Sequence, residues 1–237
     1  MTIINSFTQG QNAYLLTDTS WLDNETGIIL GTCRKIVVGK RFPWAIAVTG
    51  DAHVEELTNQ INHLDPLDAE DLALSLPQLL RGLKALSFDP SFTMALRLAA
   101  WSEAFGCPRV FHIDTDAHRA AQFGCEPWEL LEAHVLIPGE RSAPHIRHLV
   151  SPIERISDPG LFDPESDGLS VIAAQRLHER YPAKCGKEPI ALVGCSAELC
   201  RVSPDGVEIK TIYEWPDDRA GGRIQPKGGE NVLAEAL

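Results

Sequence analysis

Residues 2–7 read TIINSF, and they are followed by QGQN at 9–12 and AYLLT at 13–17. Glycine among polar residues is typical of a turn, so the two apolar segments are predicted to pair as antiparallel strands. Thr2 begins the first strand, and Asp18 follows the second. Once the initiator methionine is removed, Thr2 would hold a hydroxyl nucleophile and an amine base, a combination that supports covalent catalysis.

The composition is that of an ordinary globular protein. The chain has 237 residues, of which 44% are hydrophobic and 23% charged, enough to bury a sizeable core. A net charge of −12 disfavours nucleic-acid binding. No segment reaches the ~20 apolar residues that span a bilayer, and the first ten residues do not resemble a secretory signal. The six cysteines lack the spacing of a disulfide framework. We therefore expect a reduced, cytoplasmic protein with no nucleic-acid or membrane partner.

The following segments predict a second hairpin and then helices. Residues 35–38 and 44–48 are apolar, and glycine and proline lie between them, as in a connection between two strands. Asp51 is expected to cap a first helix. The leucines of residues 72–83 predict a second helix with a break near Pro77. Residues 92–105 predict a third helix.

The rest of the chain returns to strands, so that strands and helices are segregated. This order predicts an α+β fold with antiparallel sheets and helices on their outer faces. One domain is expected over residues 1–216, followed by a flexible C-terminal tail at 217–237. The remaining elements are expected as strands at 109–113 and 130–137, an irregular loop at 138–167, a helix at 168–180, and strands at 190–202 and 207–213.

Four short features together resemble the proteasome β-subunit branch of the N-terminal nucleophile (Ntn) hydrolases. They are Thr2, the sequence TDTS at 17–20, Lys35 with Ile36, and VTGD at 48–51. Asp18 follows Thr2 by 16 residues, which matches the spacing in that family. The resemblance implies a four-layer αββα sandwich.

The resemblance also implies roles for single residues. The hydroxyl oxygen of Thr2 would attack a carbonyl group, and the α-amino group of Thr2 would take the proton. Lys35 would lie beside the nucleophile, where its charge lowers the pKa of nearby groups, and Asp18 would hold Lys35 by a charge-assisted hydrogen bond. The N–H of Gly50 would stabilise the oxyanion, a contribution of about 3 kcal/mol for one such donor.

The chain also departs from the family pattern. Ser20 stands where the family usually has arginine, so it is a weak candidate. The family's later serine–aspartate pair has no clear counterpart, because residues 183–186 read AKCG. Ser142 is a weak candidate for a further site serine. Met1 must be removed, because a capped Thr2 has no free amine.

The resemblance implies a threonine-type amidohydrolase or peptidase that acts on a small-molecule or peptide substrate and forms a homo-oligomer. Its alternative is a catalytically inactive proteasome-like fold that serves as a homo-oligomeric structural or binding protein. A third possibility is an enzyme of another class with its site in residues 138–167. No cofactor is implied. No metal site is expected either, because Asp114, Asp116 and His118 resemble an acidic loop and His145 and His148 lie in the predicted loop.

Each of these residues also has a structural explanation. Thr2 is β-branched and suits the start of a strand, and Asp18 suits a turn. Lys35 would then be an exposed charge at a sheet edge, and Gly50 a turn residue before a helix cap. The leucines of residues 72–80 could form a surface for helix packing between subunits, or they could fill the core.

Overall fold

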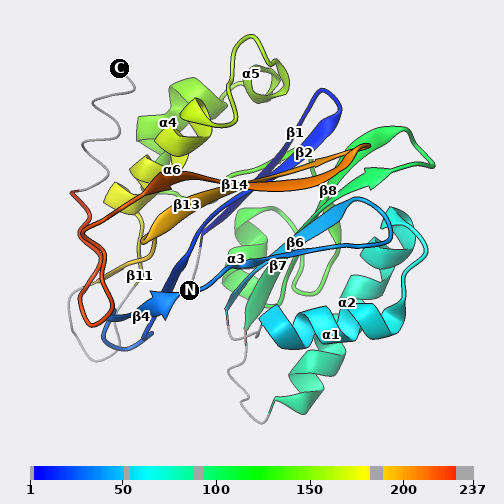
Figure 1. Ribbon diagram of the computed structural model, residues 1–237, viewed down its shortest axis with the longest axis horizontal. Helices are drawn as coiled ribbons and strands as arrows, with labels where there is room; N and C mark the ends of the chain where they lie inside the picture. The colour runs from blue at the N-terminus through cyan, green and yellow to red at the C-terminus, as the bar shows by residue number, and fades with distance from the viewer. Residues whose placement is uncertain (1–2, 51–53, 88–92, 182–188, 228–237) are drawn as a thin grey trace.

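The computed structural model describes residues 3–50, 54–87, 93–181 and 189–227. Within these ranges the chain has an α+β fold with antiparallel sheets and six helices (Figure 1). In the same ranges, no helix combines the length and apolar character that crossing a membrane requires.

The first sheet is built around the predicted N-terminal hairpin, which the structure confirms. Gln9 faces Asn12 across the turn, and Gly10 has a φ of +56°, a conformation that glycine adopts at little cost. At the other end of the hairpin, Ile4 faces Thr17. The strand order is β10-β1-β2-β13-β14, with bounds β1 Ile4–Gln9, β2 Asn12–Asp18, β10 Val135–Leu136, β13 Ser196–Ser203 and β14 Gly206–Glu214.

The second sheet contains the second predicted hairpin. Ile36 faces Ala47 across its two strands, which are mostly buried. The strand order is β5-β6-β7-β8-β9, with bounds β5 Ile36–Val38, β6 Trp44–Gly50, β7 Met94–Ser102, β8 Cys107–Asp114 and β9 Leu131–Glu132. Two short sheets complete the strands: β3 Ser20–Leu22 with β4 Ile29–Thr32, and β11 Arg180–Tyr181 with β12 Ile190–Ala191. The sequence predicted strand structure only for β12, as the start of one strand over 190–202, which the structure divides into β12 and β13.

Three large apolar clusters hold the two main sheets and their helices together, and a fourth, smaller one includes Leu22 and Ile29 of β3 and β4. One packs α2 against β6 and β7, and includes Leu72, Ile46 and Leu96. Another packs α4 and α6 against the first sheet. The third contains side chains from both sheets, among them Leu15 and Ala99. Figure 1 shows α1 and α2 on one side of the strands and α4, α5 and α6 on the other. The helices are α1 Val54–Leu64, α2 Ala69–Leu86, α3 Ala117–Gln122, α4 Ala143–Val150, α5 Ile153–Ser157 and α6 Ser166–His178.

The helix predicted over residues 92–105 is wrong, because Met94–Ser102 form strand β7. Eight of the nine residues of β7 are buried, since one side faces α2 and the other faces the first sheet. A strand covered on both faces is apolar throughout, so its sequence shows no two-residue alternation and cannot be told from a buried helix by periodicity.

The prediction of an irregular loop at 138–167 is also wrong in part. Helices α4 and α5 lie within it, and Pro144 is in the first turn of α4, where a missing N–H removes no helical hydrogen bond. The break predicted near Pro77 is wrong as well, because α2 is one helix over Ala69–Leu86 with Pro77 in its interior.

Two further expectations concern surfaces. Leu72, Leu76, Leu79 and Leu80 are buried within the chain, so these side chains fill the core and do not form a free surface. Residues 217–227, expected as part of a flexible tail, pack onto the domain: Ile224 is buried, and the Asp218 carboxylate forms an ion pair with Arg176 inside α6. The rest of that segment, 228–237, lies outside the described residues.

Candidate functional site

The side chain of Asp18 is at the centre of a buried polar cluster at the end of β2. Its Oδ1 accepts a hydrogen bond from Lys35 Nζ at 2.9 Å. Its Oδ2 accepts from the backbone N–H of Ser20 at 3.0 Å and of Gly194 at 3.2 Å, and also from the hydroxyl of Ser20. The carboxylate is fully buried, so these donors replace the water that a charged group would otherwise need.

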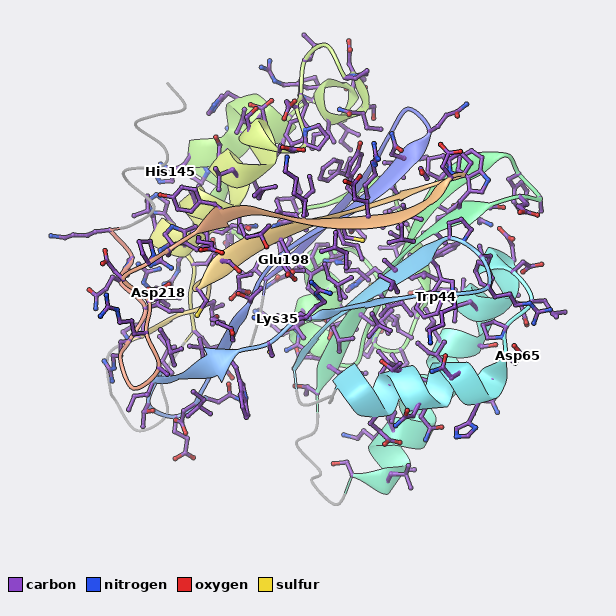
Figure 2. All side chains as sticks on the ribbon, viewed as in Figure 1. Lys35, Trp44, Asp65, His145, Glu198 and Asp218 are labelled. Carbon is purple, nitrogen blue, oxygen red and sulfur yellow. The ribbon has the colours of Figure 1, made fainter. Side chains whose placement is uncertain are left out.

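Lys35 reaches this cluster from the second sheet. Its carbonyl accepts a hydrogen bond from the N–H of Val48 on β6, which fixes the backbone just before β5. Lys35 is only 5% exposed, and lysine is almost never buried unless its charge is paired. Its burial excludes the explanation that Lys35 is an exposed charge at a sheet edge. The preceding residue, Arg34, has its guanidinium 3.6 Å from the carboxylate of Glu198, and Figure 2 labels both Lys35 and Glu198.

Gly50 ends β6, two residues beyond Val48, whose N–H binds the carbonyl of Lys35. Its φ is +104°, and a Cβ at this position would lie 2.2 Å from the carbonyl oxygen of Thr93. Only glycine fits here, because both the backbone conformation and the neighbouring chain exclude a side chain. Asp51, the predicted helix cap, lies outside the described residues.

A second polar pair links β1 to α6. Gln175 on α6 donates hydrogen bonds to the side-chain oxygen of Asn5 at 2.7 Å and to the carbonyl of Pro138 at 2.6 Å. The segment after β10 is therefore held beside the start of β1. Just beyond it, the backbone N–H of Ser142 donates to Glu179 Oε1 at 2.7 Å, and Ser142 is fully buried.

The structure thus brings together Asp18, Lys35 and Ser20, and it pairs the backbone N–H of Ser142 with Glu179, the residue that follows α6. Sequence reasoning missed Glu179, because it sought the acidic residue at 183–186. That stretch comes after α6 in the sequence and lies outside the described residues. It also missed Gly194, which acts through its backbone N–H and leaves no side-chain signal in the sequence.

Thr2, the proposed nucleophile, also lies outside the described residues. The description begins with Ile3, which is 6% exposed and immediately precedes β1. Within the described ranges, no group of three or more His, Cys, Asp and Glu side chains is arranged to hold a metal ion. Over the same ranges the cysteines are free thiols, and burial raises the pKa of Cys195 to about 11 and that of Cys200 to about 12.

Comparisons with known proteins find similarity in structure. No protein-family model matches the chain, and no curated protein matches it. The solved structure of an Anbu (Gly-1) mutant from Hyphomicrobium sp. strain MC1 matches with a TM-score of 0.64 at 16% identity, over 99% of this chain and 94% of that one. A second Anbu structure from the same strain gives a TM-score of 0.61 at 14% identity, over 99% and 93% of the two chains.

Anbu (ancestral beta-subunit) from Yersinia bercovieri matches with a TM-score of 0.57 at 12% identity, over 99% of this chain and 92% of that one. These matches extend over nearly the whole chain, and they show a proteasome-like Ntn fold. At such identities they show nothing finer than the fold.

Proposed function

We propose that this protein is an N-terminal threonine hydrolase of amide or peptide bonds, in which Thr2 becomes the nucleophile after Met1 is removed. The observation that supports this function most strongly is the buried ion pair of Lys35 with Asp18 at the end of β2. Replacing such a pair with apolar residues often costs a protein no stability. A role in chemistry explains why charged groups occupy this position.

The hairpin register connects this pair to the nucleophile. Ile4 faces Thr17, so the residues before Ile4 and the residue after Thr17 continue from the same end of the hairpin. Thr2 is bonded to Ile3, and consecutive Cα atoms are ~3.8 Å apart. The proposal therefore requires only a short extension of β1 toward Asp18 and Lys35.

The first half of the reaction would form an ester. The hydroxyl oxygen of Thr2 attacks the substrate carbonyl carbon while the α-amino group of Thr2 takes the hydroxyl proton. The carbonyl oxygen becomes negative and accepts a hydrogen bond from the N–H of Gly50. The C–N bond then breaks, and the α-ammonium group returns the proton to the departing amine. The ammonium of Lys35 favours the neutral form of the α-amino group, because like charges repel.

The second half would restore the enzyme. A water molecule attacks the ester carbonyl while the α-amino group takes a proton from it. The hydroxyl oxygen of Thr2 leaves and receives that proton, and a carboxylic acid is released. Neither half needs a metal ion or a cofactor, so the proposal includes none. Ser20 would act only by orienting Asp18.

The proposal includes a finer arrangement than the comparisons show. The three large apolar clusters support a four-layer αββα sandwich, in which each sheet carries helices on its outer face.

We also propose a cytoplasmic homo-oligomer. Leu67, Leu74 and Leu86 are 66%, 75% and 64% exposed near the ends and along α2, which gives apolar surface for a second copy. A single monomer mass in sedimentation at all concentrations would contradict the assembly.

Mass spectrometry of the purified full-length protein tests the function. The intact mass should correspond to loss of Met1, and a threonine-directed electrophile such as an epoxyketone should add one equivalent at Thr2. Thr2→Ser keeps a hydroxyl and an amine and should still react, whereas Thr2→Ala should not. Retained Met1, or undiminished labelling of Thr2→Ala, would end the hypothesis. Loss of Met1 without labelling would favour the inactive structural alternative.

A further inference from the structure

Two neighbouring backbone N–H groups bind two different buried carboxylates. The N–H of Gly194 donates to Asp18 Oδ2 at 3.2 Å, across 176 residues of sequence. The next N–H, that of Cys195, donates to Asp218 Oδ2 at 2.8 Å. Asp218 lies in the segment that follows β14, where Figure 2 labels it. The two-residue segment 194–195 therefore links the carboxylate beside Lys35 to the C-terminal part of the chain.

Asp218 is itself held on both oxygens by Arg176 of α6. Arg176 Nη1 donates to Asp218 Oδ2 at 2.7 Å, and Nη2 donates to Oδ1 at 2.8 Å. The two side chains are 1% and 0% exposed, and the guanidinium also donates to the carbonyls of Val193 and Gln225 at 2.8 and 2.7 Å. A bidentate pair of this kind fixes direction as well as distance.

The linking segment has little freedom to adjust. Cys195 has a φ of +64°, which is unfavourable for a residue other than glycine. A Cβ on Gly194 would lie 2.7 Å from Ile224 and 2.9 Å from Asp218 Oδ2. The carbonyl of Cys195 accepts a hydrogen bond from the N–H of Trp215 at 2.8 Å. The position of the Gly194 N–H is therefore set by the segment from Trp215 onward.

We propose that Arg176 and Asp218 are positioning residues of the hydrolase site. They fix the Gly194 N–H, which together with the N–H of Ser20 holds Oδ2 of Asp18 and turns Oδ1 toward Lys35. Neither residue contacts the substrate. This inference rests on the proposed function for its effect on reactivity, and it makes residues 215–227 part of the support of the site.

Conservative substitutions at this pair test the proposal. In the wild-type protein, each carboxylate oxygen of Asp218 accepts hydrogen bonds from two N–H donors. In Asp218→Asn, an amide NH₂ group takes the place of one of these oxygens. A donor must then face donors, and the linking segment must move. Arg176→Lys keeps the charge and loses the bidentate contact. A double substitution, Arg176→Met with Asp218→Leu, removes both charges and avoids an unpaired buried ion.

The matched control is Glu208→Gln. Glu208 forms an ion pair with Arg201 at 2.7 Å across β13 and β14, and both side chains are at least half exposed. This variant therefore loses an ion pair in the first sheet and leaves the contacts of residues 194–195 intact. Circular dichroism at the assay temperature should show that each variant is folded before it is compared.

The first measurement is the rate of electrophile labelling at Thr2 as a function of pH. Labelling needs the neutral α-amine, whose reference pKa is about 7.7–8.0, and a well-placed Lys35 ammonium lowers that pKa. We expect Asp218→Asn to react about 10- to 100-fold more slowly, as for other misplaced groups, with its midpoint moved to higher pH. Arg176→Lys should fall between wild type and Asp218→Asn, and Glu208→Gln should match wild type. A folded Asp218→Asn with the wild-type rate and midpoint would overturn the proposal.

The second measurement separates this inference from the proposed function. Hydrogen exchange followed by NMR reports directly on the Gly194 N–H in the absence of any labelling. The Gly194 N–H should exchange at least about tenfold faster in Asp218→Asn and in the double variant than in Glu208→Gln, because its hydrogen bond to Asp18 is weakened. Unchanged exchange would refute the positioning role even if wild type is labelled. An unlabelled wild type with faster exchange in the variants would instead refute the hydrolase and leave the structural link established.

Discussion

Lys35 Nζ lies 2.9 Å from Asp18 Oδ1, although Asp18 is in the first sheet and Lys35 leads into the second. Asp18 ends β2 of the first sheet, and Lys35 immediately precedes β5 of the second. This ion pair ties the two sheets together at the end where β1 begins. It combines a structural contribution with the charge that the proposed chemistry requires.

Breaking this pair from one side should cost much more than an exposed pair would. Lys35→Met removes the Lys35 ammonium from the buried carboxylate of Asp18, and Asp18→Asn removes the carboxylate charge from the buried ammonium of Lys35. We expect each to lower the free energy of unfolding by about 3–5 kcal/mol, against about 0–1 kcal/mol for the exposed pair of Arg41 with Asp65. Urea denaturation measures both. The variant that carries both Lys35→Met and Asp18→Asn should lose less unfolding free energy than the sum of the two single losses. Strict additivity would show that the pair is not coupled.

Gly50→Ala should be severely destabilising. The Cβ would approach the Thr93 carbonyl oxygen to 2.2 Å, and the φ of +104° is strained for alanine; the strain alone costs about 1–3 kcal/mol. Gly206 is a matched control, because its φ is +136° and a Cβ there meets nothing within 4 Å. Thermal unfolding of both variants separates strain from steric overlap. Equal losses for Gly50→Ala and Gly206→Ala would mean that the close approach of Thr93 is unimportant.

Glu179→Ala should destabilise the chain by about 1–3 kcal/mol, because the buried N–H of Ser142 loses its acceptor. Glu179→Gln keeps a side-chain oxygen at this place and should lose much less. Urea denaturation distinguishes the two. If Glu179→Gln is as unstable as Glu179→Ala, the negative charge matters and the hydrogen bond to Ser142 is not the main contribution.

His112 should make the protein sensitive to acid. Burial lowers its pKa to about 3, with a further lowering from the nearby charge of Arg97, whereas the unfolded chain has a histidine pKa of about 6.5. The unfolded state then binds one more proton between these values. Stability is fully present above pH ~6.5 and falls by up to about 1.4 kcal/mol per pH unit as the pH drops toward 3.

His112→Gln cannot take up this proton, so it isolates the effect of the histidine. The difference in unfolding free energy between wild type and His112→Gln, measured in urea at pH 7, 6, 5 and 4, should shrink or reverse as the pH falls. A difference that is constant over this range would show that His112 does not titrate between the two states.

The parts of the fold that the sequence predicted are local. The first hairpin follows from a turn at Gly10 between apolar segments. The second follows from two apolar segments separated by residues 39–43, which include a glycine and a proline. Strand β7 was missed because burial on both faces removes the alternation that identifies a strand. The helices in residues 138–167 were missed because Pro144 resembles a loop residue although it suits the first turn of a helix.

The residues of the candidate site also differ in whether the sequence alone can indicate them. Asp18, Lys35 and Gly50 all lie in the first 50 residues, at the end of β2, just before β5 and at the end of β6, so their order and spacing could indicate a shared site. Gly194 and Asp218 join them only through tertiary contacts. The backbone N–H of Gly194 reaches Asp18, and the N–H of the adjacent Cys195 reaches Asp218. No local pattern announces such partners, because nothing in the neighbouring sequence depends on them.

The central claim concerns the distance between Lys35 Nζ and the hydroxyl oxygen of Thr2, and a crystal structure of the protein after removal of Met1 measures it directly. The proposed hydrolase predicts a separation within about 6 Å, the range over which one charge strongly affects a neighbouring group. A larger separation in an ordered site would contradict the mechanism, whatever the fold.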